Sequence, residues 1–298
     1  MLAIPLASNA ISSLVVKRFV KDQNKEHINV TFHRRIPDVV KGVRTLKRSV
    51  LPDGPPCRLP STLPPPGNLQ LSLFVEELIG DGRCGTVFST HPDLLLDLSN
   101  KSVEVLEPGL PYLPSLVIKV ADHAHVEDLA AEASIYEEME NLQGVAIPRY
   151  YGWFEAELEP TWTVDFNPSK TETAPSTAPG RLSLLLLERM GPLLPIGERL
   201  SDRSDIWAIF SDLAQLGIEQ PDMRYSNILV APLAASPTTL PGNTCPYHNC
   251  VHKYRIIDFD RARKVDWTLK QHYYEQVGTL GRLLEMMEMN VILEPWEY

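Results

Sequence analysis

QPDMRYSNILV, residues Gln220–Val230, and KYRIIDFD, residues Lys253–Asp260, are two strand-like segments with polar side chains at their ends. Asp222 and Asn227 lie five residues apart, and an apolar run follows the asparagine. The second segment ends an apolar run on Asp258. Carboxylate and amide oxygens in such positions can hold Mg²⁺ on a phosphate and orient a hydroxyl towards it. The two segments therefore predict a site for phosphoryl transfer.

A glycine-rich turn lies upstream, in LSLFVEELIGDGRCGTVFST, Leu71–Thr90. Gly80, Gly82 and Gly85 are followed by Val87, which gives G-x-G-x-x-G-x-V between two strand-like runs. Glycines at a hairpin let backbone N–H groups approach phosphate oxygens, because no Cβ stands in the way. No helix pattern follows the last glycine, which argues against a dinucleotide-binding fold. An ordinary turn is the alternative, and the glycines alone leave it open.

A lysine and a glutamate follow at a suitable distance. SLVIKVAD, Ser115–Asp122, places Lys119 in a β-rich run. Such a lysine is either an exposed position on a half-buried strand or a phosphate ligand that pairs with a helix glutamate. A helix ended by Gly144 is predicted over Val126–Gly144. Glu132 is chosen as the partner because it lies beside an apolar stripe made by Leu129, Ala133, Tyr136 and Met139, whereas Glu137, Glu138 and Glu140 lie towards the polar side.

The remaining pattern predicts further strands, helices and loops. Strands are expected over His27–Ile36, Ile147–Phe154 and Arg181–Met190, the last one buried. Helices are expected over Ser201–Ile218, with Ile206, Phe210, Leu213 and Leu216 on one face, and over His272–Asn290. Loops are expected over His91–Pro114 and over Thr161–Gly180, the second because it is rich in proline, serine and threonine.

A basic first segment precedes an acidic remainder. Met1–Gln70 carries 11 lysines and arginines against 4 acidic residues, a net of +7, whereas the whole chain has a formal charge of −10. Leu51–Gly67 has seven prolines in seventeen residues, which predicts a linker or an extended strap. This arm either binds an anionic partner or folds back on its own body, and folding back is the simpler expectation.

Several classes of protein are disfavoured by composition. No run of 18 apolar residues exists, so neither a membrane-spanning helix nor a membrane partner is expected, and no nucleic-acid partner is expected. Four cysteines at irregular spacing suggest a reducing compartment, which is cytoplasmic or nuclear. Lys17 and Arg18 follow the first apolar run instead of preceding it, which argues against a secretory signal. A mitochondrial presequence is the alternative, although arginine is sparse.

A group of cysteines and histidines lies between the two strand-like segments of the site. Cys245, His248, Cys250 and His252 occur in TCPYHNCVHKY, Thr244–Tyr254, and their density suggests zinc. Four ligands within eight residues would have difficulty surrounding one ion tetrahedrally, and a Cys-x-x-Cys pair is absent. We therefore expect a plain hairpin loop and leave metal binding open.

Taken in chain order, these motifs resemble the protein-kinase set over Leu71–Ala262. LQGVAIP at Leu142–Pro148 and DFDRA at Asp258–Ala262 are similar to segments of divergent kinase-like proteins of basidiomycete fungi. The resemblance implies an α+β, protein-kinase-like two-lobe fold with a reduced C-terminal lobe. It divides the chain into a basic arm with a linker (1–70), an N-lobe with hinge (71–190) and a truncated C-lobe (191–298).

The resemblance also implies roles for individual residues. Lys119 and Glu132 would form the activating ion pair, and Asp222 would orient the acceptor hydroxyl and take its proton. Asn227 and Asp258 would hold Mg²⁺. ATP would contact the glycine turn, the strand lysine and the hinge, that is Gly80, Gly82, Gly85, Val87, Lys119, Leu187, Glu188 and Met190, with Leu187 at the back of the adenine pocket.

The chain departs from the kinase pattern at three places. Gln220 and Pro221 replace the usual His and Arg before the catalytic Asp, although an amide at Gln220 can still donate to a backbone carbonyl. Asp260 replaces the glycine after the metal-binding Asp, so that turn loses its freest residue. Only 40 residues follow Asp258, and no A-P-E motif occurs among them, which implies the reduced C-terminal lobe.

Three functions are consistent with these residues. The first is Mg-dependent transfer of a phosphoryl group from ATP to a protein serine or threonine. The second keeps the chemistry and uses a small-molecule acceptor. The third is a pseudokinase that binds nucleotide or a partner and catalyses nothing. Catalysis is favoured by Lys119, Asp222, Asn227 and Asp258, whereas Gln220 and the short C-terminal part favour the third function.

Overall fold

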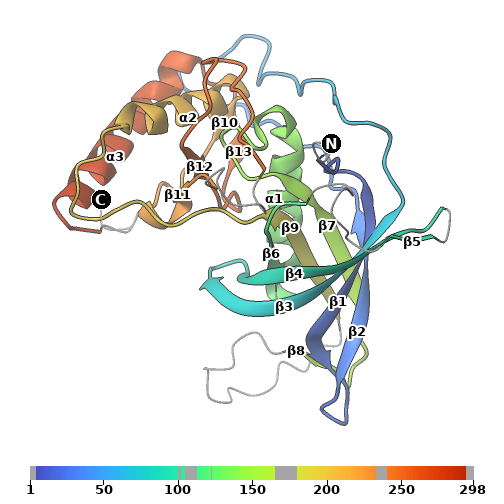
Figure 1. Ribbon diagram of the computed structural model, residues 1–298. Coiled ribbons are helices and arrows are strands. Elements are labelled where there is room, and N and C mark those ends of the chain that lie inside the picture. The colour runs from blue at the N-terminus through green and yellow to red at the C-terminus, as the bar shows by residue number, and fades with distance from the viewer. Residues whose placement is uncertain are drawn as a thin grey trace.

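One large sheet dominates the computed structural model, which describes residues 5–99, 102–104, 113–121, 123–164, 180–232 and 240–292 (Figure 1). Its nine strands are β1 (Ile11–Lys21), β2 (His27–Arg35), β3 (Leu69–Asp81), β4 (Thr86–Asp97), β5 (Ser102–Glu104), β6 (Leu116–Ala121), β7 (Tyr150–Glu157), β8 (Thr163–Val164) and β9 (Arg181–Glu188). The two further strand pairs and the three α-helices of the described residues lie to one side of this sheet.

Seven of these strands close into a ring. Their order is β2-β7-β9-β6-β4-β3-β1, and pairing of β1 with β2 completes the circle. β1 runs parallel to β3, with Leu14 opposite Leu71, and antiparallel to β2, with Leu14 opposite Phe32. The other neighbours around the ring are antiparallel. The sheet is therefore a closed, mixed, seven-stranded barrel.

The expected two-lobe protein-kinase fold is wrong. The described chain forms a closed mixed barrel with three α-helices, and it does not form an open N-terminal sheet joined to a helical second lobe. The physical reason lies in the first 35 residues. They were expected to be an arm, but β1 and β2 pair with β3 and β7 and so satisfy the sheet edges that an open sheet would leave unpaired.

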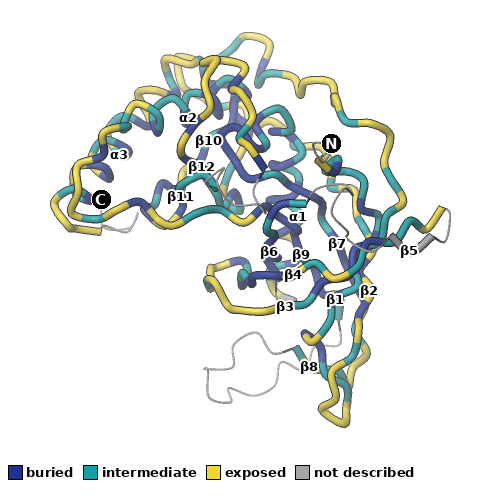
Figure 2. The backbone as a smooth tube through the Cα atoms, in the orientation of Figure 1, coloured by how far each residue is buried: buried dark blue, intermediate teal, exposed yellow. Residues whose placement is uncertain are grey.

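The central strands are buried on both faces, because the barrel interior lies on one side and the helices on the other. Along β6, Leu116, Ile118 and Val120 point into the barrel core, and Val117 and Ala121 belong to a second core against the helices. β9 alternates in the same way, with Leu184 and Leu186 inside and Leu185 and Leu187 outside. Figure 2 shows these strands as the most buried part of the sheet. The continuous apolar runs of both strands have this cause.

Three α-helices cover the second core. They are α1 (Val126–Glu138), α2 (Arg203–Gln215) and α3 (Leu269–Glu288), and they confirm the predicted helices to within a few residues. α1 packs on β7 and β9, and its predicted apolar stripe is fully buried. Two short pairs, β10 (Ile218–Glu219) with β13 (Arg263–Lys264) and β11 (Ile228–Val230) with β12 (Tyr254–Ile256), complete this side. Within the described ranges, no helix combines the length and apolar character needed to cross a membrane.

The proline-rich segment runs along the surface of the helical side. Residues 36–68 contain isolated bridges but no helix or longer strand, and all of them are described. Leu51 N–H donates to the carbonyl of Asp266, and Arg58 pairs with Glu137 of α1 at 3.1 Å. The predicted boundary at residue 70 falls at the beginning of β3, and the segment connects β2 to that strand across the helices.

Two predicted loops have different outcomes. The loop expected over His91–Pro114 is wrong in its first part, because β4 continues to Asp97 and pairs there with β3 and β5. Residues 105–112 lie outside the described part. For the loop expected over Thr161–Gly180, residues 165–179 also lie outside it, and Thr163 and Val164 form β8.

His272, in the first turn of α3, makes folding stability depend on pH. The ring is buried against Trp267, and neither nitrogen has a hydrogen-bond partner in the described part. Burial lowers the pKa of His272 from 6.5 to about 4. The folded state thus binds fewer protons than the unfolded state between these values, so stability is full above about pH 6.5 and falls as the pH falls towards 4.

We expect His272 to account for a loss of about 2 kcal/mol in the free energy of unfolding between pH 7.5 and pH 5. Urea unfolding at both pH values measures it as the difference between the wild type and His272→Leu, which lacks the titrating ring. His27→Gln, which changes an exposed histidine of β2, is the control and should keep the wild-type pH dependence. Equal pH dependence in wild type and His272→Leu would contradict the assignment.

Candidate functional site

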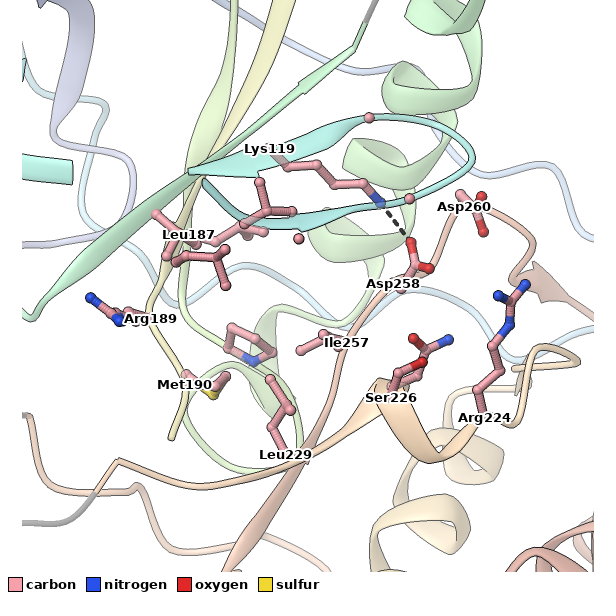
Figure 3. Close-up of a pocket in the computed structure, with 18 of the residues that line it drawn as sticks. Lys119, Leu187, Arg189, Met190, Arg224, Ser226, Leu229, Ile257, Asp258 and Asp260 are labelled. Atoms are coloured by element: carbon pink, nitrogen blue, oxygen red, sulfur yellow. Dashed lines mark hydrogen bonds and ion pairs between the residues drawn. The ribbon is translucent and has the colours of Figure 1, made fainter. Parts of the chain in front are cut away.

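The residues that the sequence singled out gather around one pocket of about 790 Å³. Its lining comes from the β3–β4 hairpin, β6, α1, the end of β9, the segment before β11 and the segment after β12. It includes Gly80, Gly82, Gly85, Val87, Lys119, Glu132, Leu187, Glu188, Met190, Asp222, Asn227 and Asp258. In Figure 3, Leu187, Met190 and Leu229 lie towards one end of the pocket, and Lys119, Asp258 and Asp260 lie towards the other. The pocket therefore has an apolar end and a charged end.

Lys119 bridges two carboxylates at the charged end. Its Nζ lies 2.7 Å from Glu132 Oε2 and 2.6 Å from Asp258 Oδ1, and the second contact is drawn in Figure 3. Burial would lower the pKa of Lys119, but Glu132 and Asp258 raise it above its ordinary value, so the ammonium stays charged. Burial raises the pKa of Glu132, and Lys119 opposes that rise. The choice of Glu132 is confirmed, because Glu137 and Glu138 pair with Arg58 and Lys264 instead.

The glycine turn forms the tip of the β3–β4 hairpin above the charged end. Gly80 pairs with Val87, and Gly82 N–H donates to the carbonyl of Gly85 at 3.0 Å. A Cβ on Gly85 would come within 2.7 Å of the Val120 carbonyl oxygen, so the hairpin can lie on β6 only because this residue is glycine. A Cβ on Gly80 would meet nothing within 4 Å, and this position borders the open pocket.

Asp222 is held from two sides in the segment before β11. Arg224 Nε lies 2.6 Å from Asp222 Oδ1, and Asn227 Nδ2 donates to the Asp222 backbone carbonyl at 3.1 Å. Tyr225–Asn227 form a short 3-10 turn that leads into β11. The Asn227 amide nitrogen is thus occupied, and its oxygen is the atom suited to coordinate a cation. Arg224 was not selected from the sequence, although its place two residues after Asp222 could have indicated it.

Asp258 has a left-handed backbone conformation, with φ of +65°. Such a conformation is costly for a residue other than glycine, and it must be stabilised by its surroundings. Gln220 supplies part of that support, because its Nε2 donates to the Asp258 carbonyl at 2.7 Å. Phe259 N–H, one residue on, donates to Glu132 Oε1 at 3.2 Å. The Gln220 amide, which replaces the usual histidine, therefore positions the turn after β12 by donating to the Asp258 carbonyl.

The charged end has the donor atoms that Mg²⁺ prefers. Carboxylate oxygens of Asp222, Asp258 and Asp260 all lie within 4.8 Å of one another, and Asn227 lines the same part of the pocket. Magnesium binds oxygen ligands and usually keeps several waters, so a few carboxylates around an open space suit it. The residues present fit the ion, with Asp258 shared between it and Lys119.

Asp260 is tied to the glycine hairpin. Arg83 Nη2 and Cys84 Sγ both lie 2.8 Å from Asp260 Oδ2. Burial and the neighbouring Asp260 raise the pKa of the Cys84 thiol, so this cysteine stays protonated and donates. Asp260 replaces the usual glycine, but it does not have the positive φ that glycine adopts readily. The positive φ in this turn is at Asp258. Sequence reasoning had not anticipated this contact between Asp260 and the hairpin.

The apolar end is formed by the segment that follows β9. The Glu188 side chain turns away into an ion pair with Arg149, at 2.7 Å, so only its backbone can serve a ligand. Leu187 and Val87 provide apolar surface, and Leu229 lies opposite, near Met190 in Figure 3. Among the described residues, no backbone hydrogen bond is found for the Met190 N–H. This end suits a flat apolar group that accepts a hydrogen bond.

Comparison of the chain with protein-family models and with curated proteins finds no match. The resemblance to kinase-like proteins of fungi therefore stays a prediction that depends on the motif residues themselves.

Proposed function

We propose that the pocket binds ATP with Mg²⁺ and transfers its terminal phosphoryl group to a hydroxyl, with protein serine and threonine as the first acceptors to test. The observation that carries this proposal is the convergence of Lys119, Asp222 and Asp258 at one end of a pocket whose other end is apolar. The four cysteines are unpaired, which supports an intracellular location.

Each end of the pocket supports one half of the ligand. The apolar surface of Leu187 and Leu229 would cover the base, and the Met190 N–H would donate to it. The glycine hairpin would lie over the phosphates, where Lys119 and Arg224 provide positive charge. Mg²⁺ held by Asn227 and Asp258 would neutralise phosphate charge.

The transfer step itself depends mainly on position. Phosphoryl transfer needs little covalent help from the protein, since alignment and charge stabilisation supply most of the rate. Asp222 would orient the acceptor hydroxyl and accept its proton, and Asn227 and Arg224 fix this aspartate from both sides. The acceptor oxygen would approach from the open side of the pocket near Ser226.

A second function is nucleotide binding without catalysis. One contact favours it, because Arg224 lies 2.6 Å from the Asp222 carboxylate and holds it as an ion pair. The ion pair occupies one of the two oxygens that could accept the proton of a hydroxyl. The two functions differ in whether Asp222 affects the rate of transfer.

Nucleotide binding is expected to depend on magnesium. MgATP at about a hundred times its dissociation constant should raise the free energy of unfolding by about 2.7 kcal/mol, and ATP with a chelator should raise it much less. Thermal melting of the purified chain with each mixture measures this difference. Asp258→Ala should remove the magnesium-dependent part, because it removes the carboxylate shared by the metal site and Lys119.

Asp93→Ala changes an exposed carboxylate of β4 outside the pocket and serves as the matched control. It should keep the full stabilisation by MgATP. A wild-type melting curve that saturating MgATP leaves unchanged would refute nucleotide binding at this pocket.

A further inference from the structure

A second group of potential ligands lies apart from the pocket, where the segment before β12 meets α2. Asp212 of α2 and Cys245, His248 and His252 each offer one ligand atom, and these four atoms lie within 4.8 Å of one another. Cys245, His252 and Asp212 are buried, and His248 is exposed towards solvent. None of the four lines the pocket of the proposed function.

The separations match those of a tetrahedral site. Cys245 Sγ lies 3.2 Å from Asp212 Oδ2 and 3.6 Å from His248 Nδ1. Asp212 Oδ1 lies 2.9 Å from His248 Nδ1, and its Oδ2 lies 3.0 Å from His252 Nε2. Zinc bonds to sulfur, nitrogen and oxygen at tetrahedral angles place such ligands about 3.3–3.6 Å apart. These four separations differ from the zinc values by a few tenths of an ångström, and all four ligand atoms lie within 4.8 Å of one another.

One atom of the cluster is left without a hydrogen bond. Asp212 is fully buried, and its Oδ1 has no hydrogen-bond partner in the described part. His248 Nδ1 is at hydrogen-bond distance from it, so the ring and the carboxylate are close but not aligned to share a proton. An unpaired oxygen of a fully buried carboxylate is costly. A cation between the two groups would satisfy both.

The surrounding contacts prepare the sulfur and one imidazole as ligands. The backbone N–H groups of Tyr247 and His248 both donate to Cys245 Sγ, at 3.3 and 3.4 Å, so the sulfur is held in place as an acceptor. His252 Nδ1 lies 2.6 Å from Asp205 Oδ1, and this contact leaves Nε2 facing Asp212. A carboxylate that holds the far nitrogen of a histidine is the usual support of a metal ligand.

We propose that Cys245, His248, His252 and Asp212 bind a structural zinc ion. The sequence favours a plain loop over a zinc site, because four ligands in one short segment would have difficulty surrounding an ion. The structure removes that objection, since the segment supplies three ligands and α2 supplies the fourth. Cys250 is not among them, because its sulfur lies 3.9 Å from Nδ1 on the other side of the His252 ring.

The ion would join the connection between the two site strands to α2. β11 follows Asn227 and β12 precedes Asp258, and residues 240–252 belong to the connection between these strands. Binding would release the thiol proton of Cys245 and add a tether between this connection and the helical core. The tether is separate from the hydrogen bond by which Cys245 N–H closes the loop onto the Cys250 carbonyl.

The test is the metal content of the full chain, purified without a histidine tag from zinc-supplemented cells. Elemental analysis should find zinc in a stoichiometric amount, and His248→Gln, whose side chain is exposed, should lose it while remaining folded by circular dichroism. Cobalt added to the zinc-free chain should give a thiolate charge-transfer band, which Cys245→Ser should abolish. Asp205→Asn should keep the ion with about 10–100-fold weaker affinity.

Cys250→Ser is the matched control and should retain zinc and the cobalt band. If the purified protein lacks zinc and neither metal binds on titration, the cluster is an ion-pair network around His252 and the proposal is overturned. If Cys250→Ser loses the metal and His248→Gln keeps it, the proposed ligand set is also overturned. No nucleotide enters these measurements, so they are independent of the function proposed for the pocket.

Discussion

Asp222→Asn is expected to retain MgATP binding and to lower the rate of phosphoryl transfer by about 10²-fold or more. The substitution keeps the size of the side chain and the backbone contact to Asn227, but it removes the carboxylate that would accept the hydroxyl proton. Binding is measured by the MgATP-induced shift in melting, and transfer by mass spectrometry of acceptors incubated with labelled ATP. The combination of intact binding and lost transfer assigns the aspartate to the chemical step.

Two comparisons make this result decisive. Asp53→Asn, at an exposed position in the segment between β2 and β3, should keep both binding and transfer. Arg224→Gln removes the cation beside Asp222 and should change the rate without removing the carboxylate. If the wild type and Asp222→Asn turn over ATP at the same low rate with every acceptor, catalysis is excluded and the non-catalytic function is supported.

Lys119→Met is expected to destabilise the fold by about 3–5 kcal/mol, because it leaves the buried Glu132 carboxylate without its cation. Glu132→Gln should cost less, since Lys119 keeps Asp258 as a partner. The double variant should be more stable than the sum of the two losses predicts, because a neutral glutamine needs no cation. Urea unfolding of the four proteins gives the coupling energy, and the same cycle on phosphoryl transfer should also be non-additive.

Arg58 and Glu137 form the matched control pair. They join the surface segment to α1 at 3.1 Å and are both partly exposed, so single and double substitutions there should change stability by less than about 1 kcal/mol. Additive losses for Lys119 and Glu132 would mean that the two side chains do not act as a pair.

The site was predictable because its determinants are local. Lys119 lies on a strand and Glu132 on the helix that follows at once, so the pattern of apolar residues alone selects which glutamate faces the strand. Asp222 and Asn227 lie five residues apart, and the Asn227 amide donates to the Asp222 carbonyl. Spacing within one element, or between two consecutive elements, determines such contacts, and the sequence displays spacing directly.

Neither the closure of the barrel nor the fourth ligand of the cluster could be predicted, because each depends on residues that lie far apart in the sequence. β1 pairs in parallel with β3, although β2 and a further 33 residues without a periodic pattern separate the two strands in the sequence. The net charge of residues 1–70 indicated a basic arm, yet the Arg34 side chain donates to the carbonyls of Ile11 and Tyr151 within the barrel. Asp212 is a buried carboxylate on an otherwise apolar helix face, and only the folded structure brings it to Cys245.

The ring of strands also imposes an order on folding. The β1–β2 hairpin precedes β7 in the chain, so β2 must wait for β7, whose Glu155 lies opposite His33. Until then the outer edge of β2 exposes unpaired backbone groups that could join another chain. The unpaired hairpin carries a strong positive charge, from Lys17, Arg18 and Lys21 on β1 and from Arg34 and Arg35 on β2. Repulsion between these charges opposes the association of two such hairpins. The positive charge of β1 and β2 thus disfavours the pairing of one free hairpin with another.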